Sequence, residues 1–145
     1  MKKIVEFCEP PRWIGKAPTT GAKGRGLAYE RKVKKLLLEL YKDDLEVLLG
    51  PWVRFGNLSH YEYRQFDALL VGSKRVFLIE IKLSHKNEAF QKLHEIYLPL
   101  VQKLYSRRKV ILVQICKSIP RNFPDSVIPL SQLTTSKGYC VVLQP

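Results

Sequence analysis

Cysteine is scarce in this sequence, and the few cysteines have no spacing that would make a metal site or a disulfide framework. Cys8, Cys116 and Cys140 are far apart in a chain of 145 residues, and no Cys-x-x-Cys pair or Cys/His cluster occurs. Cys116 and Cys140 lie in apolar segments typical of strands, which favours an interpretation as small core residues. The pattern argues against a disulfide-stabilised scaffold and favours a reducing compartment.

Long apolar runs are also missing. No stretch approaches the ~20 apolar residues needed to span a bilayer, and the first residues, MKKIVEFCEPPRW, contain no apolar run of signal-peptide length. Hydrophobic residues still make up 46% of the chain, which suits one globular domain with a core. We therefore expect a soluble, intracellular protein with no membrane partner. Residues 23–145 are predicted to form one domain, and residues 1–22, rich in proline and glycine, an extended arm or a disordered tail.

Acidic residues are few, and the excess of positive charge is localised. The chain has 25 Lys and Arg against 13 Asp and Glu, a net charge of +12. Residues 1–35 hold ten basic and three acidic groups, and residues 102–121 hold six basic groups and no acid. Residues 36–101 are nearly neutral, at −1. Two basic flanks around a neutral centre predict a nucleic-acid partner; a generic solubilising charge is the alternative.

The apolar periodicity predicts an α/β fold with a mixed central sheet flanked by helices. Helices are predicted over Gly24–Lys42 and Asn87–Tyr105, the second kinked by Pro99. Its apolar stripe would consist of Ala89, Leu93, Ile96, Tyr97, Leu100 and Leu104. Strands are predicted over Trp52–Phe55, Gln65–Val71, Arg75–Leu83, Lys109–Cys116 and Tyr139–Leu143, with Gly56–Gln65 as a loop.

Three charged residues interrupt segments that should be buried. Asp67 opens the apolar run ALLV, and Glu80 and Lys82 lie inside VFLIEIKL. Buried charges cost several kcal/mol unless they are paired or bound to a metal. Strand alternation places Glu80 and Lys82 on one face, and a hairpin turn at residues 72–74 brings Asp67 close to them.

A fourth charged residue points toward the same region. Glu30 falls on the apolar stripe of the first predicted helix, in phase with Val33 and Leu37. Carboxylates are the ligands that Mg²⁺ prefers, so Asp67 and Glu80, with the carbonyl of Ile81, suit a metal site that activates water for phosphodiester hydrolysis. A buried ion pair without metal is the alternative interpretation.

The combination of Asp67 with Glu80-Ile81-Lys82 resembles the PD-(D/E)XK motif of the restriction-endonuclease-like nucleases. The predicted element order is similar to the αβββαβ core of that superfamily. The segment KGRGLAYERKVKKLLLEL, residues 23–40, resembles the first helix of archaeal Holliday-junction resolvases, with Glu30 at the position of their acid. Phe66 stands where the motif often has proline. The resemblance covers residues 23–116.

This resemblance implies a metal-dependent DNA endonuclease, a hydrolase of phosphodiester bonds with structure- or junction-directed cutting. Asp67 and Glu80 would be metal ligands, Glu30 a further possible ligand, and Lys82 the catalytic lysine. The cofactor would be Mg²⁺, with Mn²⁺ as a substitute, and no small-molecule cofactor is expected. The resemblance also implies a homodimer. The missing apolar runs predict a cytoplasmic location, and a phage-like gene product acting in its host would fit. A catalytically silent nucleic-acid-binding module, or an RNA-directed or repair nuclease, is the alternative.

Further polar residues are candidates for contacts with the nucleic acid. Tyr61 and Tyr63 stand beside Arg64 and could stack on unpaired bases. Gln91 and Gln102 resemble the glutamine that many superfamily members carry on the helix after the E-x-K strand. The predicted contact residues are Lys23, Arg25, Arg31, Arg54, Arg64, Lys86, Gln91, Gln102, Arg107 and Arg108.

Overall fold

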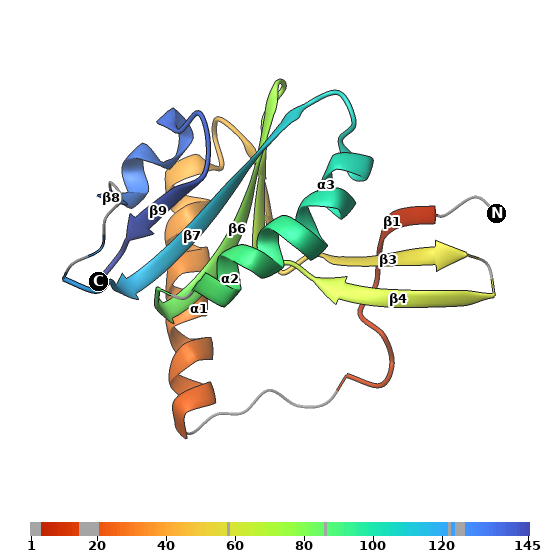
Figure 1. Cartoon of the computed structure of the whole chain (residues 1–145), viewed down its shortest axis with the longest axis horizontal. Coiled ribbons are helices and arrows are strands. Elements are labelled where there is room, and N and C mark those ends of the chain that lie inside the picture. The colour runs from red at the N-terminus through yellow and green to blue at the C-terminus, as the bar shows by residue number, and fades with distance from the viewer. Residues whose placement is uncertain (1–3, 15–20, 58, 86, 122, 124–126) are drawn as a thin grey trace.

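The computed structural model describes residues 4–14, 21–57, 59–85, 87–121, 123 and 127–145, without the side chains of Ala22, Lys23 and Ala89. Within these residues, a mixed central sheet confirms the α/β fold (Figure 1). Its strands, in spatial order, are β2 (Glu46–Leu49), β5 (Ala68–Val71), β6 (Arg75–Ser84), β7 (Lys109–Ser118), β9 (Cys140–Leu143) and β8 (Val127–Ile128). β6, β7, β9 and β8 run parallel, whereas β2 and β5 are antiparallel to their neighbours.

Helices cover both faces of this sheet. Helix α1 (Gly21–Tyr41) packs on the face that carries Ile79 and Ile81, using side chains three to four residues apart such as Val33 and Leu37. A short 3₁₀ turn, η2 (Leu130–Thr135), extends this layer, and its Leu130 carbonyl accepts a hydrogen bond of 2.6 Å from the hydroxyl of Tyr41. No helix in the described part of the chain is long and apolar enough to cross a membrane.

The other face is covered by α2 (Asn87–Lys92), a π-helical turn η1 (Leu93–Tyr97) and α3 (Leu98–Leu104). Leu93, Tyr97 and Val101 are buried there with Leu78 of β6. Fully burying one such side chain stabilises the fold by about 1.5–3 kcal/mol. Glu80 and Lys82 share the face of Leu78 by strand alternation, so they lie on the side covered by these helices.

A bent hairpin joins the central sheet to another sheet, built from β1 (Ile4–Cys8), β3 (Trp52–Asn57) and β4 (His60–Gln65). β2 continues into β3, and β4 into β5, with both strands bending at the same level. The N–H of Gly50 donates to the carbonyl of Asp67 at 2.9 Å, and the N–H of Phe66 donates to the carbonyl of Pro51 at 3.0 Å. Gly50 has φ of 61°, a conformation that other residues rarely adopt. The bend places Asp67 at the corner between the sheets.

Several sequence-based expectations were wrong at this hairpin, whereas residues 4–8 of the arm are extended, as one of the two alternatives for the arm predicted. The predicted loop Gly56–Gln65 contains β4, so Tyr61 and Tyr63 lie on a strand, and the predicted strand Gln65–Val71 is broken at Phe66–Asp67. Residues 4–8 of the arm form β1, whose pairing with β3 is non-local and leaves no local signal. Trp13, which follows in the arm, is 72% exposed. Residues 15–20 lie outside the described residues.

Candidate functional site

Asp67 is held at the corner by a backbone group of the neighbouring strand. The ladder between β5 and β6 ends at the pair Ala68–Ile79. Beyond this pair, the N–H of Ile81, two residues after Ile79, donates to Oδ2 of Asp67 at 2.8 Å. Since the N–H and C=O of one strand residue point to the same side, the carbonyl of Ile81 also faces Asp67.

Glu80 and Lys82 project side by side from β6, as the strand period predicted. Oε1 of Glu80 lies 3.3 Å from Nζ of Lys82. The side chain of Glu80 is 4% exposed, whereas that of Lys82 is 39% exposed. The carboxylate is therefore buried at the base of the site, and the ammonium group reaches solvent.

Glu30 approaches Asp67 from helix α1. Its side chain is 20% exposed, and Oε2 lies 3.3 Å from Nζ of Lys34 one helical turn later. The carboxyl of Glu30 is also within hydrogen-bonding reach of the carboxyl of Asp67. Two carboxyl groups can hydrogen-bond only when one of them carries a proton. The inward phase predicted for Glu30 is confirmed.

The environment of Asp67 strongly favours its protonated form. Burial is the main cause, followed by the hydrogen bond with Glu30 and by repulsion from Glu80 and Glu30. The N–H of Ile81 opposes them only in part, so the pKa of Asp67 is raised to about 9. A carboxyl group whose pKa is raised by burial and by neighbouring acids is typical of a functional site.

The donor set of this cluster fits a hard divalent cation. The side chains of Asp67 and Glu80 and the carbonyl of Ile81 offer oxygen only, and Mg²⁺ is commonly bound by one or two carboxylates while it keeps several waters. Among the described residues, no three His, Cys, Asp or Glu side chains form a ready-made cage. An ion here would therefore complete its shell with water or with phosphate oxygens of a substrate.

The predicted nucleic-acid contacts do not gather around this cluster. Arg54 pairs with Glu6 at 2.5 Å and lies 4.6 Å from the ring centre of Tyr61. Arg64 lies 5.6 Å from the ring centre of Phe55. Both belong to the smaller sheet. Arg25 and Arg31 are exposed on α1, and Gln91 and Gln102 are exposed on α2 and α3.

The remaining predicted contacts lie farther away or cannot be placed. Arg107 and Arg108 precede β7, whose first residue pairs with Arg75 at the start of β6. They are therefore at the opposite end of these strands from Lys82. Lys86 and the side chain of Lys23 lie outside the described residues.

Sequence reasoning missed two polar residues beside the acids. Gln114 of β7 is fully buried, stands in register with Glu80, and donates a hydrogen bond of 3.3 Å to the hydroxyl of Tyr139. The sequence does contain a signal for Gln114, because this polar residue interrupts the apolar run ILVQIC. Lys92 of α2 is attracted electrostatically to Glu80 and Asp67, and one more lysine on a helix gives no sequence signal.

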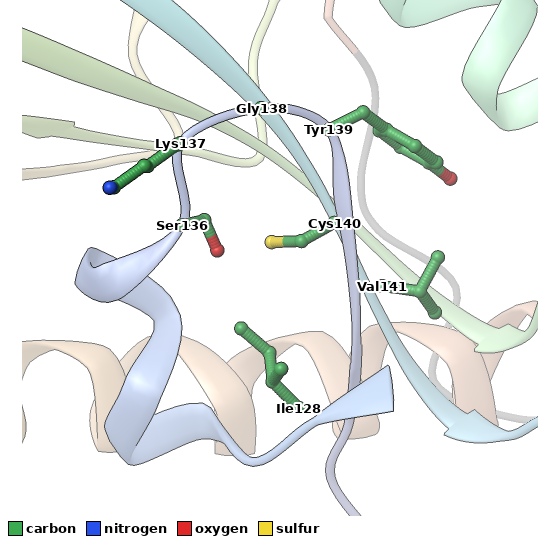
Figure 2. A pocket seen from close by; sticks show the side chains of 7 residues that line it. All are labelled: Ile128, Ser136, Lys137, Gly138, Tyr139, Cys140 and Val141. Atoms are coloured by element: carbon green, nitrogen blue, oxygen red, sulfur yellow. The ribbon is translucent and has the colours of Figure 1, made fainter. Parts of the chain in front are cut away.

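A hollow at the start of β9 is not part of this cluster (Figure 2). It measures about 390 Å³ and is lined by Ile128, Ser136, Lys137, Gly138, Tyr139, Cys140 and Val141, none of which is acidic. The Cys140 thiol and the Ser136 hydroxyl point toward each other across it. Burial raises the pKa of Cys140, with the hydrogen bond to Ser136 opposing. An un-ionised thiol is a poor nucleophile, so this hollow offers no catalytic group of that kind.

Comparisons with known proteins place the chain in no family. No protein-family model matches it, and no curated protein does. Among solved structures, protein VC1899 from Vibrio cholerae aligns with a TM-score of 0.44 and 12% sequence identity. The alignment covers 78% of this chain and 28% of that one. The chain thus spans less than a third of that protein's length, and a likeness at this level carries no argument about function.

Proposed function

We propose that this chain is a divalent-metal-dependent endonuclease that hydrolyses phosphodiester bonds in DNA. The observation that carries the proposal is the convergence of Glu30 of helix α1, Asp67 of the bend between β4 and β5, and Glu80 of strand β6, beside the exposed ammonium group of Lys82. Lys34 and Lys82 pair with Glu30 and Glu80, whereas Asp67 keeps a raised pKa that a bound cation would lower. A site of this composition suits a metal ion and a phosphate.

Each residue would have a distinct role. Asp67 and Glu80 would hold the ion with the carbonyl of Ile81, and a bound Mg²⁺ would lower the pKa of a water and neutralise phosphate charge. Lys82 would contact the scissile phosphate or orient the attacking water. Glu30 would orient Asp67 and exchange a proton with it.

Two further features support this assignment. Asp67 with Glu80-Ile81-Lys82 resembles the PD-(D/E)XK motif, and the order of α1, the bent hairpin, β6, the second helical layer and β7 is compatible with the αβββαβ order of a restriction-endonuclease-like core. The basic flanks, residues 1–35 and 102–121, suit a polyanionic substrate. The small domain favours recognition of a branched or otherwise unusual DNA shape over a long sequence, and cutting of paired strands favours a homodimer.

A cleavage assay tests the proposal directly. End-labelled four-way junction, linear duplex, single-stranded DNA and RNA of one sequence are incubated with the protein in Mg²⁺, Mn²⁺ or EDTA. We expect metal-dependent cutting of DNA, fastest on the junction. Asp67→Asn and Lys82→Met should each lower the rate by about 10² or more, and light scattering should give twice the mass of one chain.

Matched controls make the outcome unambiguous. Glu39→Gln removes an exposed carboxylate from the same helix as Glu30 and should cut as the wild type does. Cutting in EDTA, or full activity in Asp67→Asn, would contradict the site assignment. Faster cutting of RNA than of DNA would identify RNA as the substrate and would leave the assignment of the site residues unchanged.

A nucleic-acid-binding module without cleavage is the second candidate. It is favoured by the absence, among the described residues, of three side chains arranged as a metal cage, and by the pairing of Lys82 with Glu80. Salt-sensitive binding of DNA with no cleavage of any substrate would decide for this module.

A further inference from the structure

The helical layer over Glu80 contains a π turn, and its cause is Pro99. In a regular α-helix the N–H of residue 99 would bond to the carbonyl of Glu95, but proline has no N–H and its ring crowds that carbonyl. The chain widens here instead, and the N–H of Leu98 bonds to the carbonyl of Leu93, five residues back. The extra residue in the turn shifts the phase of the helix, which explains why Ile96, expected in the apolar stripe, is 42% exposed.

The same turn brings Lys92 and Tyr97 together. Residues five apart are about 140° apart around a regular α-helix, at roughly 100° per residue. Across the π turn they become neighbours, and Nζ of Lys92 lies 5.0 Å from the centre of the Tyr97 ring. The ammonium group is also within hydrogen-bonding reach of the Tyr97 side chain. Tyr97 therefore holds the otherwise flexible lysine in one direction.

Tyr97 in turn is fixed next to the acidic corner. Its side chain is buried, and its ring meets the ring of Phe66 edge to face, with centres 5.2 Å apart. Phe66 immediately precedes Asp67, so Lys92, Tyr97 and Phe66 form a continuous contact chain that ends at the predicted metal ligand.

Lys92 is attracted to Glu80 and Asp67 but forms an ion pair with neither. Lys92 is an exposed residue, like Lys103. Partial burial of its ammonium group lowers its pKa, but the hydrogen bond with Tyr97 and the attraction of Glu80, then of Tyr97 and Asp67, raise it overall. Among the described residues, no carboxylate lies within ion-pair distance of its Nζ, whereas Lys82 pairs with Glu80. A positive charge near the acids is thus left for another anion.

We infer that Lys92 is a substrate-binding residue, which contacts a phosphate oxygen of the nucleic-acid backbone at the acidic corner. The inference rests on the proposed function for the identity of the anion. Lys82 on strand β6 and Lys92 on the helix above it would then contact the backbone from different elements. The π turn would orient Lys92 for the second of these contacts.

The test compares Lys92→Gln with Lys92→Arg and with a matched control, Lys103→Gln, which removes an exposed lysine from α3 of the same layer. Binding of a labelled DNA duplex is measured in EDTA at several salt concentrations. Lys92→Gln should weaken binding about tenfold and lower the slope of log K against log salt by about one phosphate contact. Lys92→Arg should restore most of the affinity, and Lys103→Gln should change it less than about twofold.

The outcomes separate this inference from the cleavage proposal. Equal affinities and slopes for Lys92→Gln and Lys103→Gln would overturn the role of Lys92, whatever the cleavage data. If the wild type binds DNA but never cuts it, and Lys92→Gln binds DNA more weakly, Lys92 remains a phosphate contact and the proposal of nuclease activity is overturned. Wild-type protein that binds no DNA would overturn both. A structural role alone would lower the melting temperature of Lys92→Gln and leave the salt slope unchanged.

Discussion

At the scale of single residues, the site is a compromise between stability and chemistry. Glu80 and Glu30 both repel the charged form of Asp67, and the pKa of Asp67 is raised to about 9, chiefly by burial. A folding optimum would place a neutral residue at this corner. Local periodicity was enough to predict that Glu80 and Lys82 share a face and that Glu30 points inward, because strand and helix phase depend only on neighbours in sequence.

Replacing Asp67 should stabilise the metal-free protein in a pH-dependent way. The pKa of Asp67 is 3.8 in an ordinary environment and about 9 in the fold. Between these values the folded state keeps a proton that the unfolded chain releases, so the stabilising contribution is full below 3.8 and is lost as the pH rises toward 9. Asp67→Asn cannot ionise, and in EDTA at pH 8 its melting temperature should exceed that of the wild type by roughly 3–6 °C.

The comparison is made by calorimetry from pH 5 to pH 8 with Asp43→Asn as the exposed control. The difference in melting temperature between Asp67→Asn and the wild type should decrease toward pH 5. The melting temperature of Asp43→Asn, relative to the wild type, should show no such trend. A melting temperature for Asp67→Asn at or below that of the wild type at pH 8 would show that the acids do not repel one another in the fold.

At the scale of elements, the bent hairpin and the π turn shape the site. Neither could be predicted from the sequence. The bend depends on Gly50 with positive φ and on pairing of β3 with β1, about fifty residues away along the chain. The strand HYEYRQ was misread as a loop because its polar residues hide the alternation of Tyr61 and Tyr63. A proline predicts a disturbed helix, but not whether the helix kinks or widens.

The bend predicts a specific sensitivity at Gly50. A Cβ there would lie 2.9 Å from Nε2 of Gln65, and the φ of 61° disfavours any other residue. Gly50→Ala should lower the stability by about 1–2 kcal/mol. Because the N–H of Gly50 bonds to the carbonyl of Asp67, we also expect metal-dependent cleavage to fall about tenfold.

Gly26 supplies the control for this prediction. It lies in α1, and a Cβ added to it would meet nothing within 4 Å, so Gly26→Ala should raise the stability by about 0.5–1 kcal/mol. Urea unfolding of both variants gives the comparison. Stability equal to that of the wild type in Gly50→Ala would mean that the bend does not require glycine.

At the scale of the whole molecule, a chain of net charge +12 contains a small cluster of acids. Residues 1–35 and 102–121 carry the excess positive charge, and the acids lie where the two sheets meet. This distribution was visible in the sequence, whereas the arrangement of Arg54, Arg64, Arg107 and Arg108 around different parts of the fold was not, because it depends on tertiary structure. Under the proposed function, nucleic acid bound by the basic groups would supply phosphate oxygens to a metal ion held by Asp67 and Glu80.

The central claim is that Asp67 and Glu80 bind a divalent metal together with nucleic acid. It is tested most directly by Mn²⁺ titration in the presence of duplex DNA, followed by the electron paramagnetic resonance of free Mn²⁺. Lys82→Met serves as the parent because it should bind DNA without cutting it. We predict that this variant takes up about one more Mn²⁺ per chain than Asp67→Asn/Lys82→Met does. Equal uptake by the two proteins would contradict the claim.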